Sequence, residues 1–284
     1  MIAMRDYIPL RYLADWRSVV TVAATILVIS VQWSGVFRHP LLWCTSVLLI
    51  YACFLINHNH QHIPVFTRPW LNHVFDLMLT MATGLRASLL IPLHNRNHHD
   101  ARNGPGDYMT TAILRWKNPA LRLLLYPFAA AFAYAPQKVA LIRAIAHDEP
   151  WLQRRLLAQR VVLWLMLGIM LVLRPWDTVI FLLLPWFLCH YWVINANLIQ
   201  HDGCDSASSD RHSRDITGGW INWYAFNGGF HTVHHEQPHL HWSELPSAHA
   251  ARASSLTPQL KETWFLLAIW RLATGRHKRS EHSS

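Results

Sequence analysis

The sequence carries little charge for its length. Only 14% of its 284 residues are Asp, Glu, Lys or Arg, against about 25% in an ordinary soluble domain. Apolar residues make up 52% of the chain. A chain this apolar does not stay disordered, and so small a share of charged residues disfavours a purely soluble globule.

Cysteine is scarce, and the common cofactor motifs are absent from the sequence. Four Cys without paired spacing exclude a disulfide scaffold and a Cys-based zinc ribbon. The chain has no His-Pro-Gly-Gly haem signature, no Cys-rich iron–sulfur motif and no Gly-x-Gly-x-x-Gly fingerprint. Its basic residues are scattered without a nucleic-acid-binding motif, so we expect no nucleic-acid partner. Trp (15) and His (20) are abundant instead, and the net charge is +9.

Four stretches are long and apolar enough to cross a bilayer, which needs roughly 17–25 mostly apolar residues. Only short turns separate the first from the second and the third from the fourth, so we expect two helical hairpins. We expect a kink at Pro185, whose ring removes one helical hydrogen bond. The predicted spans are about 18–36, 41–57, 156–173 and 178–199.

The distribution of Lys and Arg predicts the orientation of these spans. Three Arg precede the first span, eleven Lys or Arg lie in 58–155, and eight follow residue 200. The two short turns contain only Arg38 and Arg174. Because cytoplasmic loops are enriched in basic residues, both termini and the segments 58–155 and 200–284 should be cytoplasmic. We therefore predict an all-α integral membrane protein with a single domain, 1–284.

Three further apolar stretches, 73–93, 119–136 and 262–274, are interrupted by charged residues or proline. We expect them to be amphipathic helices that lie at the membrane interface rather than cross it. The distinction matters because one extra crossing would place the two halves of the chain on opposite sides of the membrane.

Histidines gather in four clusters, each just beyond an apolar helix on the predicted cytoplasmic side. The second cluster contains the adjacent residues His98 and His99, and the fourth contains His234 and His235. The third pairs Asn197 with His201 at i, i+4. The clusters are His58 and His62; His94, His98 and His99; Asn197 and His201; and His231, His234 and His235.

Imidazole chemistry explains why histidines occur in this pattern. A neutral imidazole binds iron, zinc, copper and nickel, and spacings of i, i+3 or i, i+4 on a helix aim two rings at one ion. Nine histidines exceed the needs of one ion but suit two ions with four or five ligands each. Adjacent histidines point about 100° apart on an α-helix, so each can serve a different ion. We assign no metal role to His73, His147, His190, His212, His249, His277 and His282, because a lone histidine at a membrane edge is more often an interfacial residue. His60 should face away from His58 and His62. His239 and His241 follow the last cluster closely and are candidates to support its ligands.

The ordered motifs His-x-x-x-His, His-x-x-x-His-His, Asn-x-x-x-His and His-x-x-His-His resemble the membrane-bound fatty-acid desaturase and hydroxylase superfamily. The run FNGGFHTVHHEQPHLHWSELP, residues 226–246, is similar to the third histidine box of bacterial fatty-acid desaturases. The resemblance extends from His58 to about Pro246. It implies two transmembrane hairpins under a cytosolic helical cap that holds two iron ions, in a bacterial inner membrane.

The resemblance also implies the roles of individual residues and the partners. Asn197 matches a position that holds a water on one iron in some desaturases, and no catalytic residue is implied beyond the metal ligands. The substrate would be a lipid or acyl chain with dioxygen, and a separate protein such as a ferredoxin or rubredoxin would supply electrons. The implied iron ligands are His58, His62, His94, His98, His99, His201, His231, His234 and His235.

Several alternatives stay open at this point. The three-residue gap between His94 and His98 occurs in desaturases but also resembles alkane monooxygenases, so hydroxylation of an alkane, lipid or terpenoid is the alternative to desaturation. A metal transporter should carry acids within its spans, and the four predicted spans contain none. A structural scaffold would leave the histidines unexplained.

Four acidic residues lie close to the histidine clusters. Each is a candidate acceptor for the second N–H of a ligand imidazole, and each is as readily a solvated loop acid or a helix cap. They are Asp100, Asp107, Asp202 and Glu236.

Overall fold

The computed structural model describes residues 9–114 and 118–277, and this part of the chain is predominantly helical. Two parallel strands of two residues each pair Asp215 with Lys261 and Ile216 with Glu262. The α-helices are α1 (Trp16–Ser34), α2 (Pro40–His62), α3 (Pro69–Thr83), α4 (His99–Ala101), α5 (Pro119–Phe132), α6 (Ala135–Asp148), α7 (Pro150–Leu173), α8 (Pro175–Thr178), α9 (Leu184–His201), α10 (Gly219–Tyr224), α11 (His231–Glu236), α12 (Leu245–Ala251) and α13 (Phe265–Ala273). The 3-10 turns are η2 (Leu13–Asp15), η3 (Ala87–Leu89), η5 (Thr111–Ile113) and η7 (Pro258–Leu260), the π-helices are η4 (Ile91–His98) and η6 (Val179–Leu183), and the strands are β1 (Asp215–Ile216) and β2 (Lys261–Glu262).

The described residues form two compact units, each built from separate stretches of sequence. The first unit combines 9–90 with 145–189, and the second combines 91–144 with 190–277. The long α9 begins in the first unit and ends in the second. Since each unit interleaves distant stretches, neither corresponds to one continuous segment of the chain.

Four helices have the length and apolar composition to cross a membrane, as predicted. They are Leu13–Ser34, Pro40–His62, Pro150–Leu173 and Pro175–His201. Only 17% to 39% of the apolar window in each is buried by the rest of the protein. So large an exposed apolar surface is stable against lipid and not against water, and the chain is therefore an integral membrane protein.

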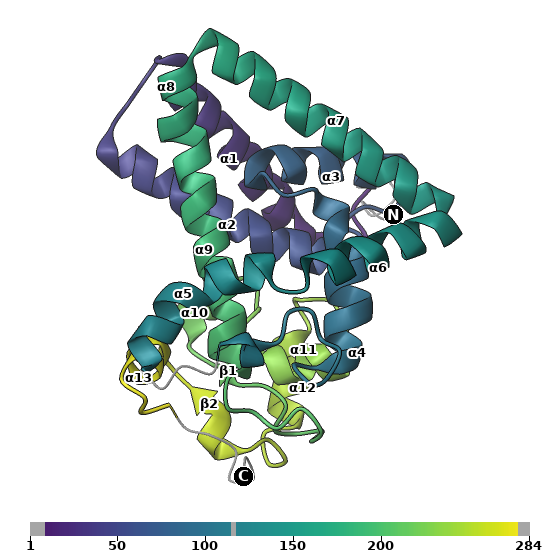
Figure 1. Cartoon of the computed structure of the whole chain (residues 1–284), viewed down its shortest axis with the longest axis vertical. Helices are drawn as coiled ribbons and strands as arrows, with labels where there is room; N and C mark the ends of the chain where they lie inside the picture. The colour runs from purple at the N-terminus through teal and green to yellow at the C-terminus, as the bar shows by residue number, and fades with distance from the viewer. Residues whose placement is uncertain (1–8, 115–117, 278–284) are drawn as a thin grey trace, which may run out of the picture. The chain divides into compact units, whose positions relative to one another are not determined.

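Within the first unit, the turns of the two hairpins are held together by polar contacts. α1 and α2 form the first hairpin, and α7 runs into α8 at the turn of the second (Figure 1). Asp177 accepts hydrogen bonds from Arg38, at 2.6 Å, and from Arg174, at 3.2 Å. The indole of Trp33 donates to the Thr178 hydroxyl at 2.9 Å. These contacts therefore link the turn of the first hairpin to the turn of the second.

The fourth span is irregular near its proline. The π-helix η6, Val179–Leu183, immediately precedes α9, and Pro185 is the second residue of α9. Proline has no N–H to donate to the preceding turn and its ring crowds that turn. A local π-turn accommodates both effects without ending the span.

The three interrupted apolar stretches are all helical in part. α5 has 14 residues and α13 has 9, so both are too short to cross a bilayer. α3 and the helical run Ala87–Ala101 form a sharply bent pair that counts as one broken span or a re-entrant loop. The described residues therefore contain four spans, or five if this pair is included. At the bend, a Cβ on Gly84 would overlap the Trp186 ring, and its φ of +70° favours glycine.

The core of the second unit surrounds the end of α9. Leu198 and Ile199 pack with residues of α5, β1 and α13, which lie close together (Figure 1). The outward sides of α5 and α13 carry exposed apolar side chains, including Phe128 and Trp270. This amphipathic character agrees with the interfacial position expected for both helices. The core residues are Tyr126, Ala130, Leu198, Ile199, Ile216, Ala268 and Leu272.

Candidate metal centre

The first histidine cluster lies in the last turns of α2, in the first unit. His58 and His62 are one turn apart, and their ring centroids are 5.1 Å apart. They therefore share one face of the helix, as their i, i+4 spacing predicts. His60 faces elsewhere, as expected: it is buried and its Nδ1 accepts a hydrogen bond from the Val65 N–H at 3.1 Å.

A buried carboxylate anchors this end of α2. Asp76 of α3 lies 3.4 Å from the Nε2 of His60 and accepts from the Gln61 amide at 2.8 Å. Its second oxygen accepts from two nitrogens of Arg155, one at 3.0 Å. A single aspartate thus ties α2, α3 and α7 together beside the two histidines.

The second cluster lies on a π-helix rather than an α-helix. His94 and His98 are part of η4, and α4 begins with His99. In a π-helix the main-chain hydrogen bonds join residues i and i+5 rather than i and i+4. His94 and His99 accordingly face each other, with their Nε2 atoms 3.1 Å apart. The i, i+4 spacing in the sequence predicted instead that His94 and His98 would point toward one ion.

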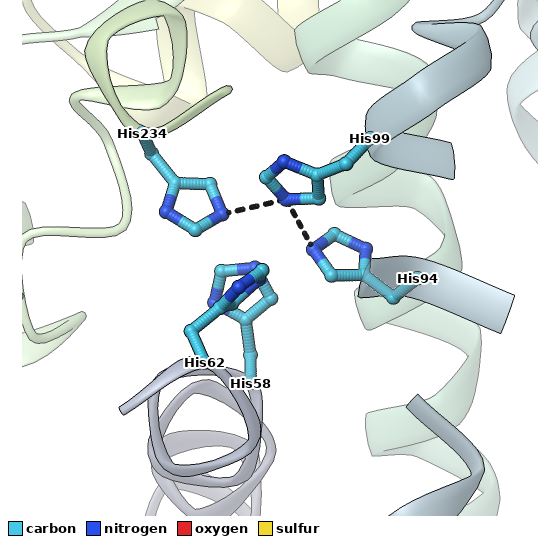
Figure 2. Close-up of side chains that lie close together, drawn as sticks. All are labelled: His58, His62, His94, His99 and His234. Carbon is cyan, nitrogen blue, oxygen red and sulfur yellow. Dashed lines mark hydrogen bonds between the residues drawn. The ribbon is translucent and has the colours of Figure 1, made fainter. Parts of the chain in front are cut away.

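Three histidines of the second unit form one group. Figure 2 shows the Nε2 of His99 lying between His94 and His234. The Nε2 of His99 is 3.1 Å from the Nε2 of each of them. All three side chains are buried. We call His94, His99 and His234 the first group; Figure 2 also labels His58 and His62 on α2.

Four other histidines of the same unit form a second group: His98, His201, His231 and His235. The Nε2 of His201 lies 3.2 Å from that of His98 and 2.8 Å from that of His231. The Nε2 of His235 lies 3.2 Å from that of His231. All four side chains are buried, and the four ligand atoms lie within 4.8 Å of one another. This is a cluster of four ring nitrogens assembled from three distant segments of the chain.

The two groups adjoin each other. The rings of His99 and His235 are stacked with centroids 4.3 Å apart. Adjacent histidines fall in different groups, His98 and His99 on one segment and His234 and His235 on the other. Neighbouring residues in sequence thus contribute to neighbouring sites in space.

The outer nitrogens of two second-group histidines have defined acceptors. The Nδ1 of His98 donates to Asp107 at 2.7 Å, and the Nδ1 of His201 donates to the His212 main-chain carbonyl at 3.1 Å. Asp107 also accepts from the main-chain N–H groups of Asn103 and Met109, at 2.7 Å each. Because an Nδ1–H donor leaves the Nε2 lone pair free, both rings are held in the tautomer that binds metal through Nε2.

The other three acidic candidates have different partners. Asp202 pairs with Arg122 and lies 3.1 Å from His277, and Glu236 pairs with Arg252. Burial raises the pKa of Asp202, but the hydrogen bond from His277 and the charge of Arg122 outweigh this, so its pKa lies below the ordinary value. Asp100 is exposed. Of the four, Asp107 is the one seen to orient a histidine.

The segment that carries the last cluster is positioned by close main-chain contacts. The Asn222 side chain donates to the Ile216 carbonyl at 2.7 Å and accepts from the Gly229 N–H at 3.0 Å. A Cβ on Gly229 would overlap both the Ile216 carbonyl and the Asn222 amide. Asp215 accepts from the Thr232 N–H in the first turn of α11 at 2.8 Å. These contacts set the start of α11, and the close approach of the main chain requires glycine at position 229.

Electrostatics favour neutral imidazoles in the second group. Burial, and then the neighbouring rings of His231, His98, His201 and His99, lower the pKa of His235 well below its ordinary value. A neutral ring keeps the lone pair that a metal ligand requires. The pocket is therefore suited to a cation and not to a cluster of protonated histidines.

Comparison with known families decides the class of protein. A family model described as fatty acid desaturase matches residues 33–266, from α1 to α13. The chain belongs to the fatty acid desaturase family. No curated protein matches the sequence.

Membership in the fatty acid desaturase family confirms the resemblance and determines the general chemistry. The protein is a membrane oxidoreductase of the desaturase or hydroxylase type, in a family that uses iron and dioxygen on lipid or acyl substrates. Family membership therefore disfavours the transporter and scaffold hypotheses.

The second group fits a bound iron ion. Two nitrogens that each lie about 2 Å from a shared first-row metal ion are separated by about 3 Å, and neighbouring Nε2 atoms of the second group are 2.8–3.2 Å apart. Nitrogen ligands of this kind suit iron among other first-row metals. When bound, iron in this family supplies the activation of dioxygen.

Asn197 lies one turn before His201, and its amide is held in one orientation. Its Nδ2 donates to the Met109 carbonyl and to the Tyr126 hydroxyl, at 2.8 Å each. A carbonyl can only accept, so these bonds distinguish the nitrogen of the amide from its oxygen. Its expected role near a metal stays a prediction.

One contributor to the site could not be found by reading motifs. His212 had been assigned no role, yet its main-chain carbonyl orients His201. A carbonyl is present at every residue, so no residue-type signal marks the one that is used. The Asp76 anchor was also missed, because Asp76 lies 14 residues beyond the histidine cluster that it supports.

Proposed function

We propose that this protein is a di-iron fatty acyl desaturase that removes two hydrogens from adjacent carbons of an acyl chain. The observation that carries the proposal is the second group, four buried histidines with converging Nε2 atoms. In the balanced reaction a saturated CH₂–CH₂ unit, dioxygen, two electrons and two protons give a CH=CH unit and two waters. The chain supplies the ligands, their orientation and a dry site.

The ligand assignment follows from the two groups and the family resemblance. One iron would be held by His98, His201, His231 and His235. The other would be held by the first group, with His58 and His62 of α2 completing its ligand set. Asn197 would hold a water beside one iron through its free amide oxygen, because its nitrogen is committed to Met109 and Tyr126.

Hydroxylation is the alternative outcome at the same site. It would consume the same dioxygen and electrons but yield one alcohol and one water. The gap of three residues between His94 and His98 supports it, because that spacing is shared with alkane monooxygenases. Displacement of the substrate by about 1 Å relative to the metals is enough to change such outcomes.

Electrons would come from a separate acidic protein such as a ferredoxin or rubredoxin. The net charge of +9 supports this choice, since complementary charge steers association. The same basic residues support a bacterial inner-membrane location with the termini and metals in the cytoplasm. A C-terminal green-fluorescent-protein fusion should fluoresce, whereas an alkaline-phosphatase fusion at the same position should be inactive.

Product mass and metal content test the central proposal. The protein is expressed in a bacterial host, the host lipids are profiled by mass spectrometry, and iron is counted in the purified protein. We expect acyl chains lighter by two hydrogens and two irons per chain. Chains heavier by one oxygen would establish the hydroxylase, and purified protein unable to bind iron would overturn both.

A further inference from the structure

The outer nitrogen of His235, a member of the second group, has no acceptor in the described part of the chain. The Nδ1 of His235 is buried and has no hydrogen-bond partner among the described residues. The Nε2 of the same ring faces His231 at 3.2 Å, so Nδ1 is the outward nitrogen. A metal-ligating histidine normally donates this second N–H to an acceptor, which fixes its tautomer and orientation.

The ring of His212 lies next to the ring of His235 and also has an unpaired nitrogen. His212 is fully buried, and its Nε2 has no partner within the described part of the chain. The centroids of the His212 and His235 rings are 5.5 Å apart, with their planes at 68°. Because a ring nitrogen lies about 1 Å from its ring centre, this separation lets facing nitrogens approach to about 3 Å, a hydrogen-bond length.

The hydrogen bonding of His212 makes its Nε2 an acceptor. The Nδ1 of His212 lies 3.2 Å from the Ser208 carbonyl, which can only accept. Nδ1 therefore carries the proton, and in a neutral ring Nε2 keeps its lone pair. The unpaired atoms of His212 and His235 are thus complementary, one an acceptor and the other a donor.

The loop around His212 is anchored on both sides, so the ring is held in place. Ser213 and Thr232 share a hydrogen bond at 2.9 Å between their hydroxyls. The buried Arg214 binds the main chain at the end of α9, where its N–H donates to the Gln200 carbonyl at 2.6 Å. Leaving two buried polar atoms unpaired is unfavourable, and a single hydrogen bond between them removes that cost.

We propose that His212 is a positioning residue that accepts a hydrogen bond from the Nδ1 of His235 and holds its Nε2 toward the second-group metal. The same residue orients His201 through its main-chain carbonyl, so one loop position serves two ligands. This inference rests on the proposed metal-binding function.

The test compares two side chains of similar length at position 212. His212→Gln keeps an acceptor oxygen, and His212→Met removes it; both keep the carbonyl that orients His201. The purified, metal-free full-length proteins are titrated in detergent with Co²⁺, a coloured substitute for Fe²⁺, and binding is followed by visible absorption. We expect two equivalents in the wild type, with one of them weakened about 10–100-fold in His212→Met and largely restored in His212→Gln.

A matched control separates loss of a ligand partner from loss of a buried histidine. His241 is as buried as His212, but its Nδ1 lies 2.8 Å from the Ser243 hydroxyl and its ring lies against Trp242. His241→Met should bind both equivalents with wild-type affinity and spectrum. If His212→Met does not fold, His212→Phe takes its place in the comparison.

The outcomes distinguish this inference from the proposed function. Unchanged Co²⁺ affinity and spectrum in His212→Met, or equal weakening in His212→Gln and His212→Met, would overturn the role of His212 while the wild type still binds two ions. A wild type that binds no ion would instead overturn the metal-binding function.

Discussion

The two compact units of this desaturase-family protein are stabilised in different ways. In the first unit, long helices expose apolar faces, and a few buried polar clusters such as that around Asp76 join them. In the second unit, α10 and α11 have six residues each, and charged side chains such as Asp107 and Arg214 are almost completely buried. A membrane helix satisfies its own backbone, whereas short helices depend on contacts from distant segments. The first unit is therefore defined locally and the second by its tertiary contacts.

The largest expected effect is loss of a ligand in the second unit with the first unit intact. His235→Ala should reduce product to background, because it removes one nitrogen of the second group. Membrane insertion should be unchanged, since the four apolar helices are untouched. Product is measured by lipid mass spectrometry and insertion by the yield in the membrane fraction. His73→Ala, at an exposed position of α3, is the control; retention of activity by His235→Ala would rule out its ligand role.

A smaller effect is expected when the buried polar cluster of the first unit is broken. Asp76→Ala leaves Arg155 and His60 without their shared carboxylate, and removal of one partner of a buried ion pair costs about 3–5 kcal/mol. The free energy of unfolding in detergent measures this loss. The control Asp148→Ala removes a highly exposed carboxylate of the same unit and should change little. A loss below about 1 kcal/mol in Asp76→Ala would show that α2 is not anchored there.

Next in size is a change that keeps the second unit folded but loosens one ligand. In Asp107→Asn an N–H group replaces one oxygen of a carboxylate that accepts three hydrogen bonds, including that from His98. We expect metal affinity to fall about 10–100-fold, measured by metal titration of the purified protein. Asp100→Asn alters an exposed acid beside the same histidines and should leave affinity unchanged. Equal affinities for the two variants would contradict the orienting role of Asp107.

The smallest effect is expected at the hairpin turns of the first unit. Asp177 binds Arg38 and Arg174, whose side chains are 41% and 45% exposed. Solvent screens such pairs, so Asp177→Asn should cost between about 0 and 1 kcal/mol of unfolding free energy. Thermal unfolding at low and high salt measures it, and the difference should shrink as salt rises. A loss as large as that of Asp76→Ala would mean that the turns hold the hairpins together.

Sequence reasoning was most successful where one residue type has one physical meaning. Three of the four predicted spans, 41–57, 156–173 and 178–199, lie within observed apolar helices, and the first, about 18–36, extends two residues beyond the helix that ends at Ser34. The family resemblance drawn from the histidine motifs was confirmed by the family match over residues 33–266. Of the four acids near the clusters, only Asp107 is seen to bind a histidine of those clusters, because proximity in sequence does not determine which way a carboxylate points.

The amino-acid sequence by itself determined the membrane helices and the supply of histidines, because hydropathy and metal-ligand chemistry belong to individual residues. Only the tertiary structure decided which of those histidines belong to the first group and which to the second. His94 faces His99 at the end of a π-helix that the motif spacing did not predict, and His201 is oriented by a carbonyl eleven residues away. Helix type and main-chain hydrogen bonding depend on the surrounding fold, and neither can be deduced from the identity of the residues that they position.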